Sequence, residues 1–310
     1  MIKMMRKART GLLLSGFAGL MLAAGSGSVF AQTCTISNWQ VNSSPGAVGL
    51  TEGNVGLPND SFSGVPFRRY GGPCGLRVPV DGTARYLSDG SPVDEAAYNA
   101  RFYVFLDSAG SENVRLFEAV NTAAGGNALE VWYEPGASKI VLKVATTDGP
   151  ANLEITGIGS GWHSVEFAWA AGETATVSLA VNVEIDTADP DDFASATLNT
   201  SGQSIGEARL GNINGANSAA AFIDFDDFDS RRVSTPGRLC RGLTVDESER
   251  DFLSSQDITS IAIEIATNGA TPAGGQPDRN EDGVVTSADI TGIAIAIGTN
   301  SNDCNSTANR

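Results

Sequence analysis

Residues 278–290 read Asp-Arg-Asn-Glu-Asp-Gly-Val-Val-Thr-Ser-Ala-Asp-Ile, and this stretch decides the fold of the C-terminal part of the chain. Its first twelve residues have the spacing of an EF-hand-type calcium loop, with oxygen-bearing side chains at positions 1, 3, 5, 9 and 12. Glycine stands at position 6, where the chain must turn, and position 7 offers a backbone carbonyl. The predicted calcium ligands are Asp278, Asn280, Asp282, Val284, Thr286 and Asp289. The alternative is a solvated turn rich in Asp, Asn and Gly.

The flanks of this loop predict a helix on one side only. The preceding residues 269–277 are rich in Gly and Pro, which a helix does not tolerate. After the loop, Ile290, Ile293 and Ile297 recur at helical spacing. Residues 254–268 match residues 286–300 at an offset of 32, so the loop and its helix are repeated. We expect two tandem loop–helix units that bury their isoleucines against each other.

Over residues 243–300 this pattern resembles a type I dockerin, the calcium module that attaches secreted proteins to cohesin-bearing partners. The resemblance implies calcium as cofactor and a cohesin-like partner. The first loop, residues 246–257, departs from the pattern because Arg250 stands at position 5 and Asp251 replaces the turn glycine. A guanidinium only donates hydrogen bonds and cannot ligate calcium, so we expect one ion, at the second loop. Positions 10 and 11, which usually contact cohesin, match only in part.

Residues 1–31 have the features of a secretory signal peptide. Four basic residues precede an apolar run over residues 11–24, and a small residue, Ala31, stands at the expected cleavage site. The run is too short for a comfortable membrane span, and no other stretch is long enough. The chain has 20 basic and 36 acidic residues, which disfavours nucleic-acid binding. We expect a secreted, extracellular or cell-surface protein.

The four cysteines all follow the predicted signal peptide. An even number in an oxidising compartment favours disulfides, and four cysteines allow three pairings. We favour Cys34–Cys74 and Cys240–Cys304, because the second pair would clamp the ends of a module too small to build much core.

The central part of the chain contains many short apolar runs with alternating polar residues and no competing helical pattern. Val, Ile, Phe, Tyr and Trp dominate residues 101–106, 114–120, 129–133, 140–145, 162–169, 176–183 and 220–228. Such spacing predicts an antiparallel β-sandwich or jelly roll. The expected fold class is therefore mainly β, a sandwich followed by a small α-helical module. The expected domains are residues 1–31, 32–236 and 237–310.

Three segments narrow the type of sandwich. They are residues 95–104, residues 162–169, and residues 205–211 followed by 221–232, and together they are similar to a concanavalin A-like, laminin G-type jelly roll. Members of that family mostly bind glycans, proteins or lipids, and some hydrolyse glycans. The resemblance implies a glycan or an extracellular protein as partner.

Catalytic candidates in the sandwich are few. His163, the only histidine, lies on a regular alternating strand, which favours a packing or hydrogen-bonding role. Glu184, Asp186 and Asp189 approximate the paired carboxylates of jelly-roll glycoside hydrolases, which stand on one strand face. The simpler interpretation is a strand end that runs into an acidic loop.

Further side chains could bind a second ion or a sugar. Asp224, Asp226, Asp227 and Asp229 suit calcium, although the alternation there is typical of a half-buried strand with a solvated side. Trp39, Trp132, Trp162 and Trp169 suit sugar stacking and core packing equally. We interpret the protein as a non-catalytic binding or adhesion protein. The alternatives are a polysaccharide-degrading glycoside hydrolase and a structural envelope protein whose tail calcium merely stiffens.

Overall fold

The protein is described here by a computed structural model, which carries no ligands. The described residues are 39–41, 49–52, 68–71, 74–106, 112–185, 187, 189–244, 250–268 and 275–310. The predicted signal peptide and residues 246–249 of the first loop lie outside these ranges. Within them, no helix has the length and apolar character needed to cross a membrane.

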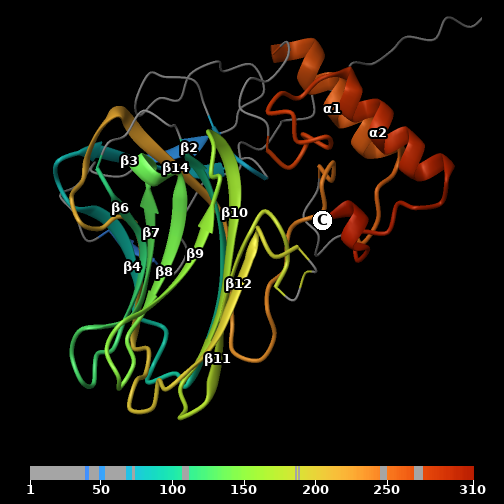
Figure 1. Cartoon of the computed structure of the whole chain (residues 1–310). Helices are drawn as coiled ribbons and strands as arrows, with labels where there is room; N and C mark the ends of the chain where they lie inside the picture. The colour runs from blue at the N-terminus through green and yellow to red at the C-terminus, as the bar shows by residue number, and fades with distance from the viewer. Residues whose placement is uncertain are drawn as a thin grey trace, which may run out of the picture. The chain divides into compact units, whose positions relative to one another are not determined.

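In the part of the chain that the structure describes, two antiparallel sheets of seven strands each form a jelly-roll-like sandwich, which confirms the expected fold class (Figure 1). Sheet A runs in the order β1 (Gln40–Val41), β4 (Arg85–Asp89), β13 (Glu207–Asn212), β6 (Val114–Val120), β7 (Asn127–Glu134), β8 (Lys139–Val144) and β9 (Ala151–Thr156). Sheet B runs in the order β12 (Phe193–Leu198), β11 (Ala175–Val181), β10 (Gly161–Ala170), β5 (Ala97–Leu106), β14 (Asn217–Arg231), β3 (Cys74–Asp81) and β2 (Gly49–Glu52). A short 3₁₀ helix, η1 (Pro135–Ala137), joins β7 to β8.

The apolar runs of the sequence form the strands at the centre of both sheets. All seven predicted runs fall on strands, namely β5, β6, β7, β8, β10, β11 and β14. Strand β10 shows the alternation, because Val165, Phe167 and Trp169 are buried in the core between the sheets while Ser164 and Glu166 point away from it. The sandwich is therefore held by one continuous apolar layer.

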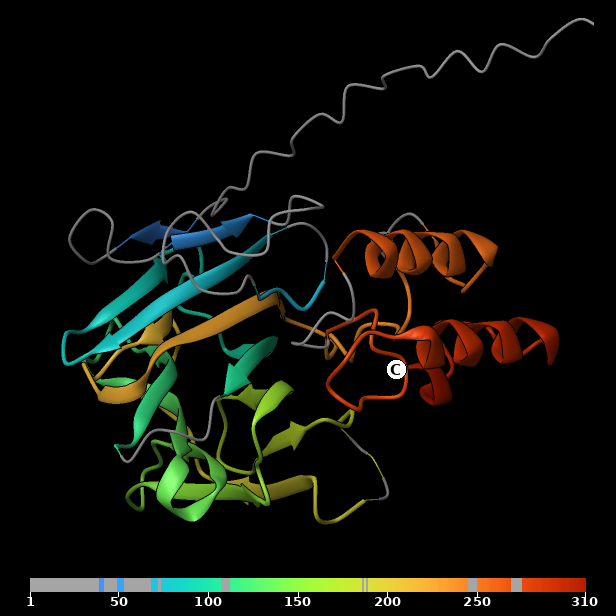
Figure 2. The same cartoon turned by 90° about the horizontal axis from the view of Figure 1, so that it is seen from above.

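The two predicted helices are present as α1 (Ser255–Asn268) and α2 (Ser287–Gly298), and they lie side by side (Figure 2). A 3₁₀ helix, η2 (Thr307–Asn309), follows them. Both α-helices begin with the same capping arrangement. The Thr286 hydroxyl accepts from Ala288 N, and the Asp289 carboxylate accepts from Thr286 N. The Ser254 hydroxyl and Asp257 do the same for α1.

The helices share a second core, separate from that of the sandwich. Its buried residues include Leu243, Leu253, Ile261, Val285 and Ile293. Ile261 and Ile293 are equivalent positions of the repeat, so the two units bury each other's isoleucine stripes as expected. A disulfide joins Cys240 to Cys304 at the two ends of this module and confirms that pairing. The other predicted pair falls on Cys34 and the side chain of Cys74, which lie outside the described residues.

Candidate metal centre and binding surfaces

The loop before α2 is shaped by its own carboxylates. Asp278, at position 1, accepts from Asp282 N at 3.2 Å and from Gly283 N at 2.8 Å. Those bonds bend the chain tightly. Gly283 has a φ of 86° and Glu281 a φ of 56°, a region that favours glycine at the turn. The turn glycine at position 6 therefore has the conformational role that the sequence predicts.

The last ligand position also begins the helix. Asp289, at position 12, is fully buried and accepts from Arg279 N at 2.7 Å, Asn280 N at 3.2 Å and Thr286 N at 2.7 Å. One carboxylate thus ties the beginning of the loop to the N-terminus of α2. Anything that stabilises this carboxylate in place also stabilises the first turn of the helix.

Burial of negative charge makes the loop suitable for a cation. Asp278 is only 4% exposed, and burial together with the carboxylates of Asp289 and Asp282 raises the pKa of Asp278 to about 6. The predicted donors are all oxygens, the ligands that calcium prefers, so their chemistry fits this ion. In the described part of the chain, however, no three His, Cys, Asp or Glu side chains are gathered as a metal site requires. Calcium binding stays a prediction.

In the first loop, a protein cation lies beside the equivalent carboxylate. Asp257 is fully buried and accepts from Thr244 N at 2.9 Å and Ser254 N at 2.8 Å. The Arg250 guanidinium pairs with it and also donates to Ser254 Oγ at 2.7 Å. A positive charge of the protein therefore already neutralises Asp257, and the degeneracy of this loop stays a prediction.

The outward side of sheet B is covered, and this corrects the expectation of a solvated face at Asp224 and Asp226. Asp224 is 0% exposed and forms a two-bond pair with the equally buried Arg77, Nε to Oδ1 at 2.6 Å and Nη2 to Oδ2 at 3.0 Å. Asp226 accepts from Tyr70 N at 2.7 Å and Gly71 N at 3.0 Å. Protein donors thus satisfy both carboxylates. Asp229 instead pairs with Arg231.

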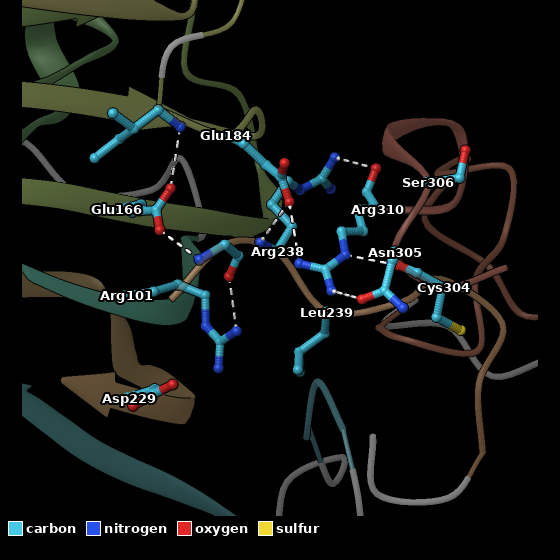
Figure 3. Close-up of polar contacts among 12 residues, drawn as sticks. Arg101, Glu166, Glu184, Asp229, Arg238, Leu239, Cys304, Asn305, Ser306 and Arg310 are labelled. Atoms are coloured by element: carbon cyan, nitrogen blue, oxygen red, sulfur yellow. Dashed lines mark hydrogen bonds and ion pairs between the residues drawn. The ribbon is translucent and has the colours of Figure 1, made fainter. Parts of the chain in front are cut away.

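Two segments of the chain lie on this side of sheet B. In the 68–71 segment, the ring of Tyr70 stacks on Tyr103 of β5 with the centroids 3.5 Å apart. Residues 237–243, hereafter the linker, follow β14. Glu166 accepts from Gly237 N at 2.6 Å, and Arg101 donates to Gly237 O at 2.8 Å (Figure 3). Burial raises the pKa of Glu166. The sequence does not predict this polar junction between Glu166, Arg101 and Gly237, because no local pattern links residues so far apart in the chain.

The carboxylates considered for catalysis do not share a strand face. Strand β11 ends at Val181, and Glu184 lies beyond it in a loop. Its carboxylate accepts from Arg238 N at 3.3 Å and lies 3.4 Å from the Arg310 guanidinium (Figure 3). Asp189 is exposed, and Asp186 lies outside the described residues. Glu184 therefore belongs to the junction with the linker, as the simpler interpretation of an acidic loop expects.

The tryptophans divide between core and surface. Trp169 is 1% exposed within the sandwich, Trp162 contacts Tyr70 and Phe105, and Trp39 contacts Phe228. Trp132 differs, because it is half-buried on the outward side of sheet A. Lys143 Nζ lies 4.2 Å from the centre of the Trp132 ring, and Trp132 Nε1 donates to Glu130 at 2.6 Å. The Arg115 guanidinium also lies over this ring, 5.3 Å from its centre, so two cationic groups lie against Trp132.

Comparisons with known proteins identify no family for this chain. No protein-family model matches the sequence, and no curated protein does. Among solved structures, the binding domain of botulinum neurotoxin serotype D is similar at a TM-score of 0.40 and 8% identity, over 59% of this chain and 47% of that one. The chain therefore spans about half of that toxin domain.

Two polysaccharide lyases are similar to the same extent. An endo-β-1,4-glucuronan lyase from the fungus Trichoderma reesei has a TM-score of 0.42 and 13% identity, over 63% of this chain and 91% of that one. An alginate lyase from Pseudomonas aeruginosa has a TM-score of 0.38 and 13% identity, over 51% of this chain and 82% of that one. None of these likenesses assigns an activity to this chain.

Proposed function

We propose that the protein is a secreted, non-catalytic binding protein. Its sandwich recognises a glycan or a surface protein, and its helical module attaches it, with calcium, to a cohesin-like partner. The observation that carries the proposal is the repeated outward surface of the two helices. On each helix, the exposed positions of this surface carry no charge, in a chain whose net charge is −16.

The two helix surfaces match position by position. Ile263 on α1 and Ile295 on α2 are equivalent in the repeat and are 54% and 59% exposed. Around them, the exposed pairs are Ser255 and Ser287, Gln256 and Ala288, Thr259 and Thr291, Ala262 and Ala294, and Ala266 and Gly298, of which three are identical. Large exposed apolar side chains at matched positions favour a protein-binding role over a solvated surface.

Calcium enters this proposal through α2. The ion would be held by Asp278, Asn280, Asp282, Thr286, Asp289 and the Val284 carbonyl, and it would supply charge neutralisation for the buried carboxylates. Because Asp289 also caps α2, binding and helix formation are expected to reinforce each other. The helix surface would then be presented fully only in the calcium-bound protein.

The experiment is a pull-down from envelope and culture medium with the secreted chain as bait, in calcium and in chelator. We expect a protein that is captured only with calcium, and whose capture is abolished in the Ile263→Lys/Ile295→Lys variant. Val233→Lys, at a 97% exposed position of the sandwich, is the matched control and should capture normally. Equal capture by both variants would refute the helix surface as the attachment site. Captured polysaccharide that is lost in Trp132→Ala would place glycan recognition on sheet A.

A further inference from the structure

We propose that calcium binding at the 278–289 loop fastens the linker, residues 237–243, onto the outward side of sheet B, with Glu281 as the coupling residue. The proposal rests on the calcium site proposed above and deepens it. It makes the ion a regulator of the junction between sandwich and helices as well as a support for α2.

The first contact between loop and linker is made by a loop position that does not bind the metal in such loops. Glu281 stands at position 4 of the loop, and its carboxylate receives two guanidinium groups of the linker. The first is that of Arg238, whose side chain is only 8% exposed, and the second is that of Arg241, 2.9 Å away. In a twelve-residue calcium loop, position 4 is free of the metal, so its side chain is available for this second task.

A second set of contacts joins the loop to the linker backbone. Arg279, at position 2, donates through Nη1 to Arg241 O at 2.9 Å. Just before the loop, Gln276 O accepts from Gly242 N at 2.6 Å, and Gln276 Nε2 donates to Cys240 O at 3.1 Å. The linker is thus held from the loop side at four residues, Arg238, Cys240, Arg241 and Gly242, and Glu281 binds the two arginines through charge.

On its other side, the same linker is held by the sandwich. Gly237 N donates to Glu166, and Arg238 N donates to Glu184 (Figure 3). Leu239 N donates to the Tyr103 hydroxyl at 2.8 Å. Three consecutive backbone amides therefore have their acceptors on the sandwich. Arg238 is the bridge, since its backbone faces Glu184 while its side chain reaches Glu281.

The physical consequence is a linkage. An ion that gathers the buried carboxylates of the loop fixes the backbone at positions 2 and 4, and this fixes the groups that hold the linker. Without the ion, neighbouring carboxylates repel and the same backbone samples more conformations. Because coupling free energies are reciprocal, a docked linker must in turn strengthen calcium binding.

The direction in which one substitution changes the calcium affinity separates this linkage from simple electrostatics. Arg238→Met removes a positive charge beside the loop and leaves Glu281 with less compensation. Electrostatics alone would therefore make calcium bind more tightly. The linkage predicts weaker binding, by about fivefold or more, because a coupling of 1 kcal/mol or more is lost. Isothermal titration with calcium measures the change, and unchanged or tighter binding overturns the proposal.

A second measurement follows the linker itself. In the wild type, calcium should slow hydrogen–deuterium exchange at the amides of residues 237–239. Glu281→Gln keeps every predicted ligand and should still bind calcium, yet its linker amides should no longer respond. Asp251→Asn, an exposed carboxyl of the same module, is the charge-matched control and should behave as the wild type. A calcium response that persists in Glu281→Gln would refute the coupling alone, whereas a wild type that binds no calcium would refute the proposed site itself.

Discussion

A single tautomer of His163 satisfies its surroundings. Its Nε2 lies 3.0 Å from Gly159 O, which can only accept, so this nitrogen carries the proton. Its Nδ1 then accepts from Asn182 Nδ2 at 3.0 Å, while Asn182 Oδ1 accepts from Ser164 N. Protonation of Nδ1 would set two donors against each other. Burial lowers the pKa of His163, and its hydrogen bonds offset only part of this effect.

We expect His163 to make the sandwich less stable in acid. Because its pKa is lower in the folded chain than in the unfolded chain, the unfolded chain binds more protons between the two values. Stability from the neutral ring is complete above about pH 6.5 and is lost as the pH falls toward the folded value, by about 1.4 kcal/mol for each unit of lowering. Urea unfolding at pH 5, 6, 7 and 8 should show this slope. His163→Gln should flatten it, and an equal slope in both proteins would contradict the assignment.

The strands that could be predicted from the sequence and those that could not differ in amino-acid composition. Strand β5 reads Ala-Tyr-Asn-Ala-Arg-Phe-Tyr-Val-Phe-Leu and is rich in aromatic and branched residues. Edge strand β12 reads Phe-Ala-Ser-Ala-Thr-Leu, and β13 contains glycine. Small residues pack adequately at an edge yet leave a weak strand signal. The helices were predictable because the isoleucine spacing and its repeat depend on residues close together in the sequence.

The helical module depends on its disulfide. Cys240–Cys304 closes a span of 64 residues, and on the chain-entropy model such a crosslink contributes about 4 kcal/mol. The Cys240→Ala/Cys304→Ala double variant should therefore lose that amount from the module and leave the sandwich unchanged. Thermal unfolding followed by helix circular dichroism, with and without reductant on the wild type, measures it. Equal loss in the sandwich signal would show that the two cores unfold together.

At the scale of the whole molecule, two separate apolar cores imply two unfolding events. One core lies between the sheets and the other between α1 and α2. The sequence predicted the β-sandwich and the two helices, since these depend on neighbouring residues, and the calcium loop stays a prediction. It did not predict the buried pair of Arg77 with Asp224, 147 residues apart, or the hold of Glu166 on the linker. Those contacts exist only after the sheets have formed.

Calorimetry should therefore resolve two transitions. A chelator should lower the helical one and largely spare the sandwich, because only the module contains the predicted calcium loop. At free calcium of 100 times Kd, the ion contributes about 2.7 kcal/mol. Asp282→Ala should abolish the chelator effect, while Asp251→Ala should retain it. A chelator effect of the same size in Asp282→Ala would exclude this loop as the calcium site.

The charged side chains on the outward side of sheet A specify the register in which its strands pair. Arg209 stands opposite Glu118, Glu118 opposite Glu130, and Glu130 opposite Lys143. Arg115 bridges the two facing glutamates, at 2.7 Å from Glu118 and 2.8 Å from Glu130. A slip of one residue would turn these charges into the core, and a slip of two would separate the matched partners. Pairs whose arginine is partly exposed add little strength to the finished sheet. Their value lies in the wrong pairings that they make costly, and thus in how faithfully the sandwich assembles.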